Sequence, residues 1–547
     1  MSEGGMTKAP GRWRKVCRPL QLALVLLIFC LTLCHGIVIG QYDVGFHPMY
    51  RLRQTLAIAI SRMQLPPAHG YLAYQSVVDA LDENGFAVYP NDKGPHLDVA
   101  GWTALFADPV RLDAALKQAT TTPIDLSLPP QLIRGNELAY ADYVYVAFRL
   151  FGPHFASLYY FYFVLLGIGC ILFILEFRTS PFLIFLLSAY LAGLFFLQNY
   201  AVSQGDQLAT LANSRLFDAL SLLPAMHIFL TIWLRLPWRT LTVATVTGQS
   251  GLLAFLIDCR TTSFWLMVMI VVGTAVILIE GRNGRLSERR WCQVKMGWPA
   301  AIAVALLALH IAFIRVDADE RYRSETKYHI IWHEVLRGML ASNLELQRIY
   351  VGKVTKLDDG NDQIAYDALM KDINERNDDT SAAAYRRDGQ IYIDADRSYL
   401  AYDQLARSLA LRILIAHPLL LSESIPEKFA DQIHWFTLDG AMRAANLAGA
   451  LGFTAVTGLL SLICGRIRTS KLRPLRGIAA ATIVLACALI PPLIEPTNLS
   501  VGTLLAFLIA ASAGVFLLAA LAAEFAAKLL GWAPQPNQPS ASGTSSA

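Results

Sequence analysis

The apolar run PLQLALVLLIFCLTLCHGIVIG, residues 19–40, decides the fold class of this chain. A helix needs about 20 mostly apolar residues to cross a bilayer, and this run supplies them. Basic residues precede it, namely Lys8, Arg12, Arg14, Lys15 and Arg18. Because no small-residue cleavage site follows, the run is interpreted as an uncleaved first span with its N-terminus inside, not as a signal peptide.

The composition of the whole chain agrees with a membrane protein. Of its 547 residues, 55% are hydrophobic and 16% are charged, whereas soluble domains carry about a quarter charged residues. Further apolar runs lie near 155–176, 181–199, 217–235, 240–258, 263–281, 297–314, 443–464, 477–495 and 501–526. The sequence therefore predicts an all-α polytopic membrane protein with about ten transmembrane helices.

Basic clusters between the spans set the predicted orientation. They lie at Arg178, at Arg235 with Arg239, from Arg282 to Lys295, and from Arg466 to Arg476. Counted from an inside N-terminus, each cluster falls on the cytoplasmic side, as the positive-inside rule expects. We therefore expect a multi-pass protein of a bacterial inner (plasma) membrane, with the N-terminus and the C-terminus in the cytoplasm.

This orientation divides the chain into membrane regions and two mainly helical extracytoplasmic domains. The expected order is a basic cytoplasmic N-terminus (1–18), a first transmembrane helix (19–40), extracytoplasmic domain 1 (41–154), a six-helix transmembrane region (155–314), extracytoplasmic domain 2 (315–440), a three-helix transmembrane region (441–526) and a disordered cytoplasmic tail (527–547). None of the eight cysteines lies in either extracytoplasmic domain, so no disulfide framework or cysteine metal site is expected there. Within them, residues 47–63 are predicted to form an amphipathic helix on the outer leaflet, and Asp388-Gly389 a hairpin turn.

The stretch YHIIWHEVLRGML, residues 328–340, places two histidines four residues apart on a predicted helix. His329 and His333 could share a metal, but the helix offers no third ligand, so an apolar stripe used for packing is the favoured interpretation. The segment LDDGND, residues 357–362, does not keep the EF-hand spacing. No metal site and no cofactor are predicted, and the lack of nucleotide-binding and nucleic-acid-binding motifs argues against nucleic-acid partners.

Ionisable residues inside the spans are costly and are usually functional or paired. His227 lies near the middle of the fourth span, where structural and functional roles carry equal weight. His310 and Asp258 lie at the outer ends of their spans and are interpreted as interfacial groups, with Asp258 paired to its neighbour Arg260.

Carboxylates and cations stand next to the first two spans on the predicted outer face. Asp43 directly follows the first span, and Glu137 and Asp142 precede the second. Arg51 and Arg53 lie on the predicted interfacial helix. The tyrosine Tyr140 lies between the two later carboxylates.

This arrangement resembles the GT-C class of membrane glycosyltransferases, which use lipid-linked sugars on the outer face. The resemblance is architectural and implies that Asp43, Glu137 and Asp142 are the candidate catalytic carboxylates. It also implies substrate-binding roles for Arg51, Arg53, Tyr140 and His227. The class typically carries an Asp-Glu pair shortly after the first span, whereas this chain has Asp43 alone there.

The predicted function is therefore transfer from a polyprenyl-phosphate sugar during assembly of an envelope glycoconjugate, with membrane lipids as the other partner. Two alternatives stay open at this point. A non-catalytic scaffold would use its extracytoplasmic domains to bind protein partners of unknown identity. A transporter of lipid-linked material would need a polar route past His227.

Overall fold

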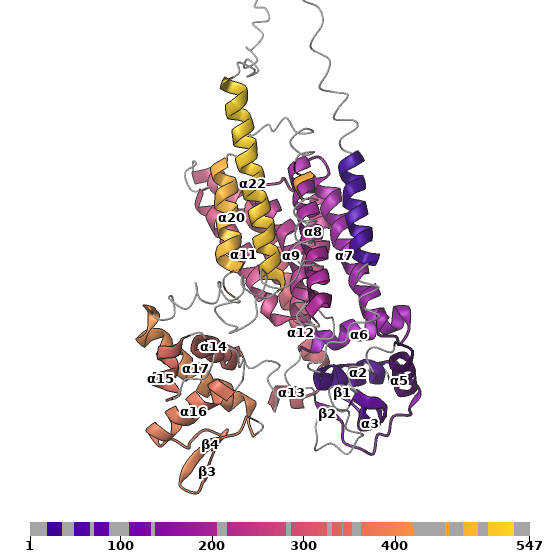
Figure 1. Cartoon of the computed structure of the whole chain (residues 1–547), viewed down its shortest axis with the longest axis vertical. Coiled ribbons are helices and arrows are strands. Elements are labelled where there is room, and N and C mark those ends of the chain that lie inside the picture. Colours follow the sequence, from indigo (N-terminus) through magenta and orange to yellow (C-terminus); the bar gives the residue numbers. More distant parts are fainter. Residues whose placement is uncertain are drawn as a thin grey trace, which may run out of the picture.

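The computed structural model describes residues 19–34, 49–65, 70–86, 109–132, 137–204, 216–280, 286–324, 331–341, 343–352, 363–395, 397–419, 454–456, 458, 474–488, 490 and 501–529. These residues are almost entirely helical, and their strands form two short antiparallel pairs. Figure 1 shows a bundle of long helices with two smaller polar units at one end.

Five described helical segments are long and apolar enough to cross a membrane. They are α7 (Ala156–Phe177), α9 (Leu216–Trp233), α10 (Thr240–Cys259), Thr261–Glu280, which comprises a 3-10 turn and α11 (Trp265–Glu280), and Gly297–Asp317 of α12 (Leu286–Asp317). Shorter apolar stretches lie in the helix Pro19–Cys34 and in α8 (Pro181–Gln204), α20 (Pro474–Ala488) and α22 (Val501–Leu529). The chain is thus an all-α membrane protein. The count of ten spans stays a prediction, and nearly all of 443–464 lies outside the described residues.

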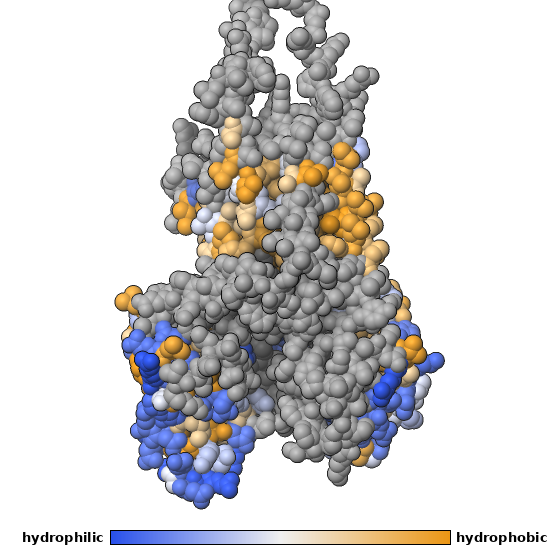
Figure 2. Space-filling view, in the orientation of Figure 1, coloured by the Kyte–Doolittle hydropathy of each residue, from blue (hydrophilic) through white to orange (hydrophobic). Residues whose placement is uncertain are grey.

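Helix α9 stands at the centre of the bundle because it is apolar on every side. Its whole apolar window is buried, and it packs against α10, α11 and α22. The outer helices instead expose large apolar side chains, such as Ile171 of α7 and Phe313 of α12. Figure 2 shows hydrophobic residues gathered over the bundle and hydrophilic residues over the polar units, as a lipid-facing bundle requires.

The first polar unit is built around α2 (Met49–Gln64). This helix packs against α3 (Gln75–Leu81), α5 (Pro109–Thr121) and α6 (Leu138–Phe151), beside the strand pair β1 (Leu72–Ala73) and β2 (Gln131–Leu132). Five consecutive residues of α2, Leu56 to Ile60, are completely buried. This part of α2 is therefore a core helix of the first polar unit, while the position of 47–63 on the outer leaflet stays a prediction.

A backbone contact fastens the first polar unit to the end of α12. Asp319 N–H donates a hydrogen bond to Gly70 O at 3.1 Å, and the Tyr322 hydroxyl, on α13 (Arg321–Ser324), donates to Tyr71 O at 2.7 Å. Gly70 has a φ of +63°, and a Cβ there would lie 2.9 Å from Asp319 N. Glycine is required at this position both for its φ and for this close approach.

The second polar unit has a hydrophobic core of its own. It comprises α14 (Ile331–Ala341), α15 (Leu344–Tyr350), α16 (Gln363–Arg376), α17 (Tyr399–Ala416) and the hairpin of β3 (Ala384–Arg387) and β4 (Gln390–Ile393). Its buried core includes Leu336, Leu369 and Leu409 and is separate from the core of the bundle.

Two sequence predictions for this unit are confirmed. Asp388 and Gly389 connect β3 to β4 with φ values of +52° and +77°, as a tight hairpin turn demands. The apolar stripe of α14 packs on α17. His333 faces the same way, 4% exposed, with its Nδ1 2.5 Å from the Tyr402 hydroxyl, whereas His329 lies outside the described residues.

Candidate functional site

Charged side chains from four helices meet where the first polar unit joins the bundle. Figure 1 shows α2 and α6 lying across the end of the bundle beside α12. Because α6 packs against both α2 and α10, and α10 packs against α12, these elements bring together residues distant in sequence. The members of this charged cluster are Arg62, Asp142, Asp258, His310 and Asp317.

Arg62 of α2 connects two carboxylates of the charged cluster. Its guanidinium makes an ion pair with Asp142 of α6, and its Nη2 lies 3.4 Å from an oxygen of Asp317 at the end of α12. The Tyr71 hydroxyl donates to the other oxygen of Asp142 at 2.8 Å. The guanidinium also lies 4.7 Å from the centre of the Tyr71 ring and 5.4 Å from that of Tyr145, distances typical of cation–π contacts.

The surroundings of Asp142 favour its protonated form more than water does. Burial raises the pKa of this carboxyl above its ordinary value, while the Arg62 charge and the Tyr71 hydrogen bond lower it. Burial also raises the pKa of Tyr71, so this hydroxyl stays protonated and remains a donor. Asp142 is thus held firmly, with both carboxylate oxygens engaged.

Asp258 and His310 form the second half of the charged cluster. Asp258 Oδ2 lies 3.5 Å from His310 Nε2, and the Phe255 ring packs edge-on against the imidazole at 5.9 Å. Both polar atoms are buried, and neither has a hydrogen-bond partner among the described residues. Asp258 also lies within electrostatic range of Glu137, Asp142 and Arg315. The near neighbour of its carboxylate is therefore His310, not the predicted Arg260.

Glu137 lies immediately before α6 and ties that helix to the turn between α10 and α11. Its Oε1 accepts hydrogen bonds from Thr261 N–H and from the Thr261 hydroxyl, both at 3.0 Å. A second buried carboxylate, Asp218 of α9, holds the same turn through the Ser263 hydroxyl at 2.9 Å and Trp265 Nε1 at 3.4 Å. These bonds fix the end of α10, where Asp258 lies.

The other predicted site residues of the first polar unit have contacts of their own. Tyr140 is 2% exposed and packs its ring against Tyr143 and Phe217, so it is a core side chain in this structure. Arg53 Nη1 lies 3.0 and 2.9 Å from the two oxygens of Asp82 and links α2 to the end of α3. Asp43 and the side chain of Arg51 lie outside what the structure describes.

His227 is buried in the middle of the bundle and is not part of the charged cluster. Its Nδ1 lies 3.5 Å from Gln249 Nε2, which also donates to Gly169 O at 2.8 Å. His227 Nε2 has no hydrogen-bond partner among the described residues. The rings of Phe173 and Phe177 pack against the imidazole.

The geometry of the charged cluster suits proton transfer. A carboxylate with one oxygen engaged only by a neighbouring imidazole can accept or relay a proton, while Asp142 and Glu137 are occupied by their own donors. Sequence reasoning missed the pairing of Asp258 with His310. A usable signal existed, because the predicted topology places the ends of both spans on the same side of the membrane.

Comparison with known proteins assigns no family to this chain. No family model matches the sequence, and no curated protein or solved structure matches it. The functional proposal therefore rests on the chemistry of the site.

Proposed function

We propose that this chain is a GT-C-like transferase that acts on a polyprenyl-phosphate sugar at the outer face of a bacterial inner membrane, in envelope glycoconjugate assembly. The observation that carries the proposal is the Asp258–His310 pair, two buried polar atoms 3.5 Å apart without hydrogen bonds among the described residues. Leaving such atoms unsatisfied costs about 1–3 kcal/mol each, and structural pairs usually avoid that cost.

In the proposed reaction, an acceptor hydroxyl attacks the anomeric carbon of the donor sugar. A new C–O bond forms to the acceptor, the C–O bond to the phosphate breaks, and polyprenyl phosphate leaves. Asp258 accepts the proton of the attacking hydroxyl, and His310 holds the carboxylate in place. Arg62 and Arg315 supply positive charge near the departing phosphate. Glu137 and Asp142 act as positioning residues through Thr261 and Arg62, and Asp43 remains a further candidate base.

The proposal includes the orientation expected from the sequence, with ten spans, both polar units outside and both termini in the cytoplasm. The positive-inside distribution of basic residues supports it. Single cysteines placed at exposed positions of each polar unit, for example Asp388 and Lys117, should react in whole cells with a membrane-impermeant maleimide. Labelling of either position only after the cells are broken would overturn this orientation.

The chemistry is tested by transfer from a panel of polyprenyl-phosphate sugars, with the purified protein in lipid nanodiscs. Asp258→Asn should lower the rate by about a hundredfold or more, which is the usual contribution of a general base. Asp113→Asn is the matched control, because Asp113 and His154 form another Asp–His pair, 3.2 Å apart, on the exposed surface of the first polar unit. This control should transfer at the wild-type rate. Full activity of Asp258→Asn would refute the assignment.

A non-catalytic scaffold is the second candidate function. The separate core of the second polar unit favours it, because a unit that folds around its own residues can serve as a docking module. Absence of transfer across the donor panel, together with a folded wild-type protein, would favour the scaffold.

A further inference from the structure

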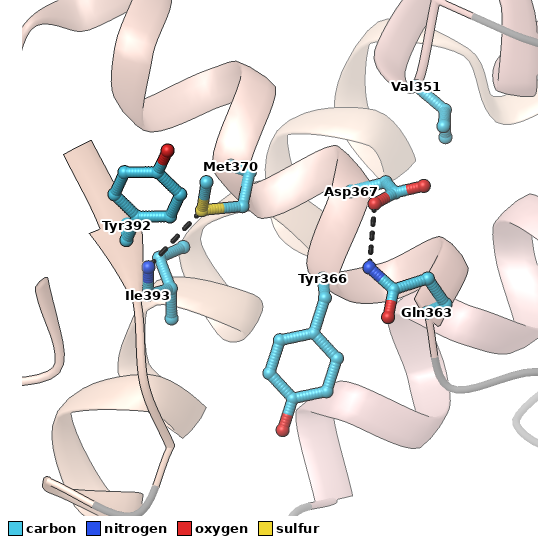
Figure 3. A pocket seen from close by; sticks show the side chains of 7 residues that line it. All are labelled: Val351, Gln363, Tyr366, Asp367, Met370, Tyr392 and Ile393. Carbon is cyan, nitrogen blue, oxygen red and sulfur yellow. Dashed lines mark hydrogen bonds between the residues drawn. The ribbon is translucent and has the colours of Figure 1, made fainter. Parts of the chain in front are cut away.

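A pocket of about 600 Å³ opens on the second polar unit between α16 and β4. This volume lies within the range of about 300–1,000 Å³ that is common for small-molecule sites. Figure 3 shows the side chains that line it, which include two tyrosines, a carboxylate and an amide. Its lining residues all belong to the second polar unit, and none belongs to the charged cluster.

Ring contacts hold the two tyrosines of the pocket in place. Tyr366 of α16 has its ring centre 5.0 Å from that of Tyr402 and 5.5 Å from that of His333. Tyr392 of β4 stacks on Tyr385 of β3 at 5.6 Å. Aromatic faces that are fixed before a ligand arrives lose little conformational entropy on binding, so they make good platforms.

The polar groups of the pocket combine hydrogen-bond acceptors with donors. Gln363 Nε2 donates to Asp367 Oδ1 at 2.8 Å, which places an amide and a carboxylate side by side on α16 (Figure 3). Met370 Sδ accepts from Ile393 N–H at 3.2 Å and ties the helix to β4. Among the residues that the structure describes, the lining includes no lysine or arginine, so this lining offers an anionic ligand no opposite charge.

We propose that this pocket binds a neutral oligosaccharide. A sugar ring presents an apolar C–H face that packs on tyrosine, and hydroxyls that both donate to a carboxylate and accept from an amide. A single ammonium group would fill only a small part of the volume, and a uronic acid or phosphate would meet the Asp367 carboxylate. This pocket is separate from the charged cluster, and sugar binding here does not depend on the transfer chemistry proposed there.

The test measures binding of neutral trisaccharides to the full-length protein in lipid nanodiscs by saturation-transfer-difference NMR. The probes are maltotriose, cellotriose, mannotriose and tri-N-acetylchitotriose, with trigalacturonate and choline as charged comparisons. At least one neutral probe should bind saturably. Tyr392→Leu should weaken that binding about tenfold, as expected for loss of one aromatic platform. Asp367→Asn, which keeps the shape of the pocket, should weaken it several-fold.

Tyr399→Leu is the matched control, because Tyr399 is a partly buried tyrosine of the same unit that does not line the pocket. Its binding should equal that of the wild type. The proposal is overturned if the wild type binds none of the neutral probes, if a charged probe binds more tightly, or if both pocket variants bind like the wild type. Asp258→Asn should bind the trisaccharides normally, so failure of transfer and failure of this pocket are distinguishable.

Discussion

Replacing Arg62 by methionine should loosen the hold on α6, because Arg62 ties that helix to α2 and to the end of α12. Methionine keeps an apolar stem beside the Tyr71 and Tyr145 rings but removes the charge that faces Asp142 and Asp317. The Arg62 and Asp142 side chains are 13% and 18% exposed, so solvent screens this ion pair only in part. A hydrogen bond to a charged group contributes about 1.5–3 kcal/mol. At neutral pH we expect a loss of about 2 kcal/mol in the free energy that holds α6 in place. The open form, in which α6 has moved away from its neighbours, should then be about 30 times more populated.

The effect of this substitution should depend on pH in a defined direction. Burial raises the pKa of Asp142 in the folded protein, so the folded state holds this proton more tightly than the unfolded state. The stability that Asp142 contributes is therefore present below its ordinary pKa and is lost as pH rises through its folded pKa. Arg62 lowers that folded pKa, and removing it should extend the loss to higher pH. Arg62→Met should accordingly resemble the wild type in acid and differ most at neutral pH.

Cys259 offers a native reporter for this opening. Its thiol is fully buried and lies 3.4 Å from Ala139 O of α6. The measurement is the maleimide labelling rate of Cys259 in nanodiscs, read by mass spectrometry and divided by the rate of an unfolded peptide at the same pH. Adding Asp142→Asn to Arg62→Met should restore most of the protection. Labelling of Arg62→Met at the wild-type rate from about pH 5 to 8, or excess labelling that grows in acid, would refute this role of Arg62.

Three further substitutions test the packing of the bundle. Gly273→Ala would put a Cβ 2.6 Å from Phe229 Cε2, so it should lower the free energy of unfolding by about 1–3 kcal/mol. Gly251→Ala, whose Cβ would meet nothing within 4 Å, is the control in a thermal unfolding series and should change it much less. Thr261→Ala removes the hydrogen bond from the Thr261 hydroxyl to Glu137 Oε1 and should weaken the turn by about 1 kcal/mol. Faster amide exchange of residues 261–264 would show this, and unchanged exchange would contradict it. His227→Leu replaces a ring whose Nε2 has no hydrogen-bond partner among the described residues, and should change stability by less than about 1.5 kcal/mol. A loss of several kcal/mol in the free energy of unfolding would contradict this expectation and show that the His227 side chain stabilises the bundle.

Features that depend on local sequence were predicted well. The apolar runs near 155–176, 217–235 and 240–258 correspond to α7, α9 and α10, because hydropathy over about 20 residues reports directly on membrane insertion. The Asp388-Gly389 turn was also predictable, because only a few residue types accept a positive φ at both central positions.

Features that depend on distant residues were predicted poorly. The sequence of α2 indicates that the helix has one polar face, but it does not indicate which residues pack on that face. In the structure Asp142, 80 residues away, and Asp317, 255 residues away, meet Arg62 on that face. Asp258 was assigned to Arg260 because sequence shows chain neighbours, whereas the packing of α10 on α12 brings it to His310.

The contact of Gly70 and Tyr71 with the end of α12 sets an order of events during synthesis. Tyr71 and Tyr322 are separated by 251 residues. At about 5–20 residues added per second, the ribosome needs roughly 10–50 s to make that length of chain. For that time the nascent first polar unit exists without the segment that fastens it, and Arg62 is without Asp317. A chain arrested before residue 317 would therefore present an unfastened unit, and membrane quality-control proteases would have a defined early product to remove.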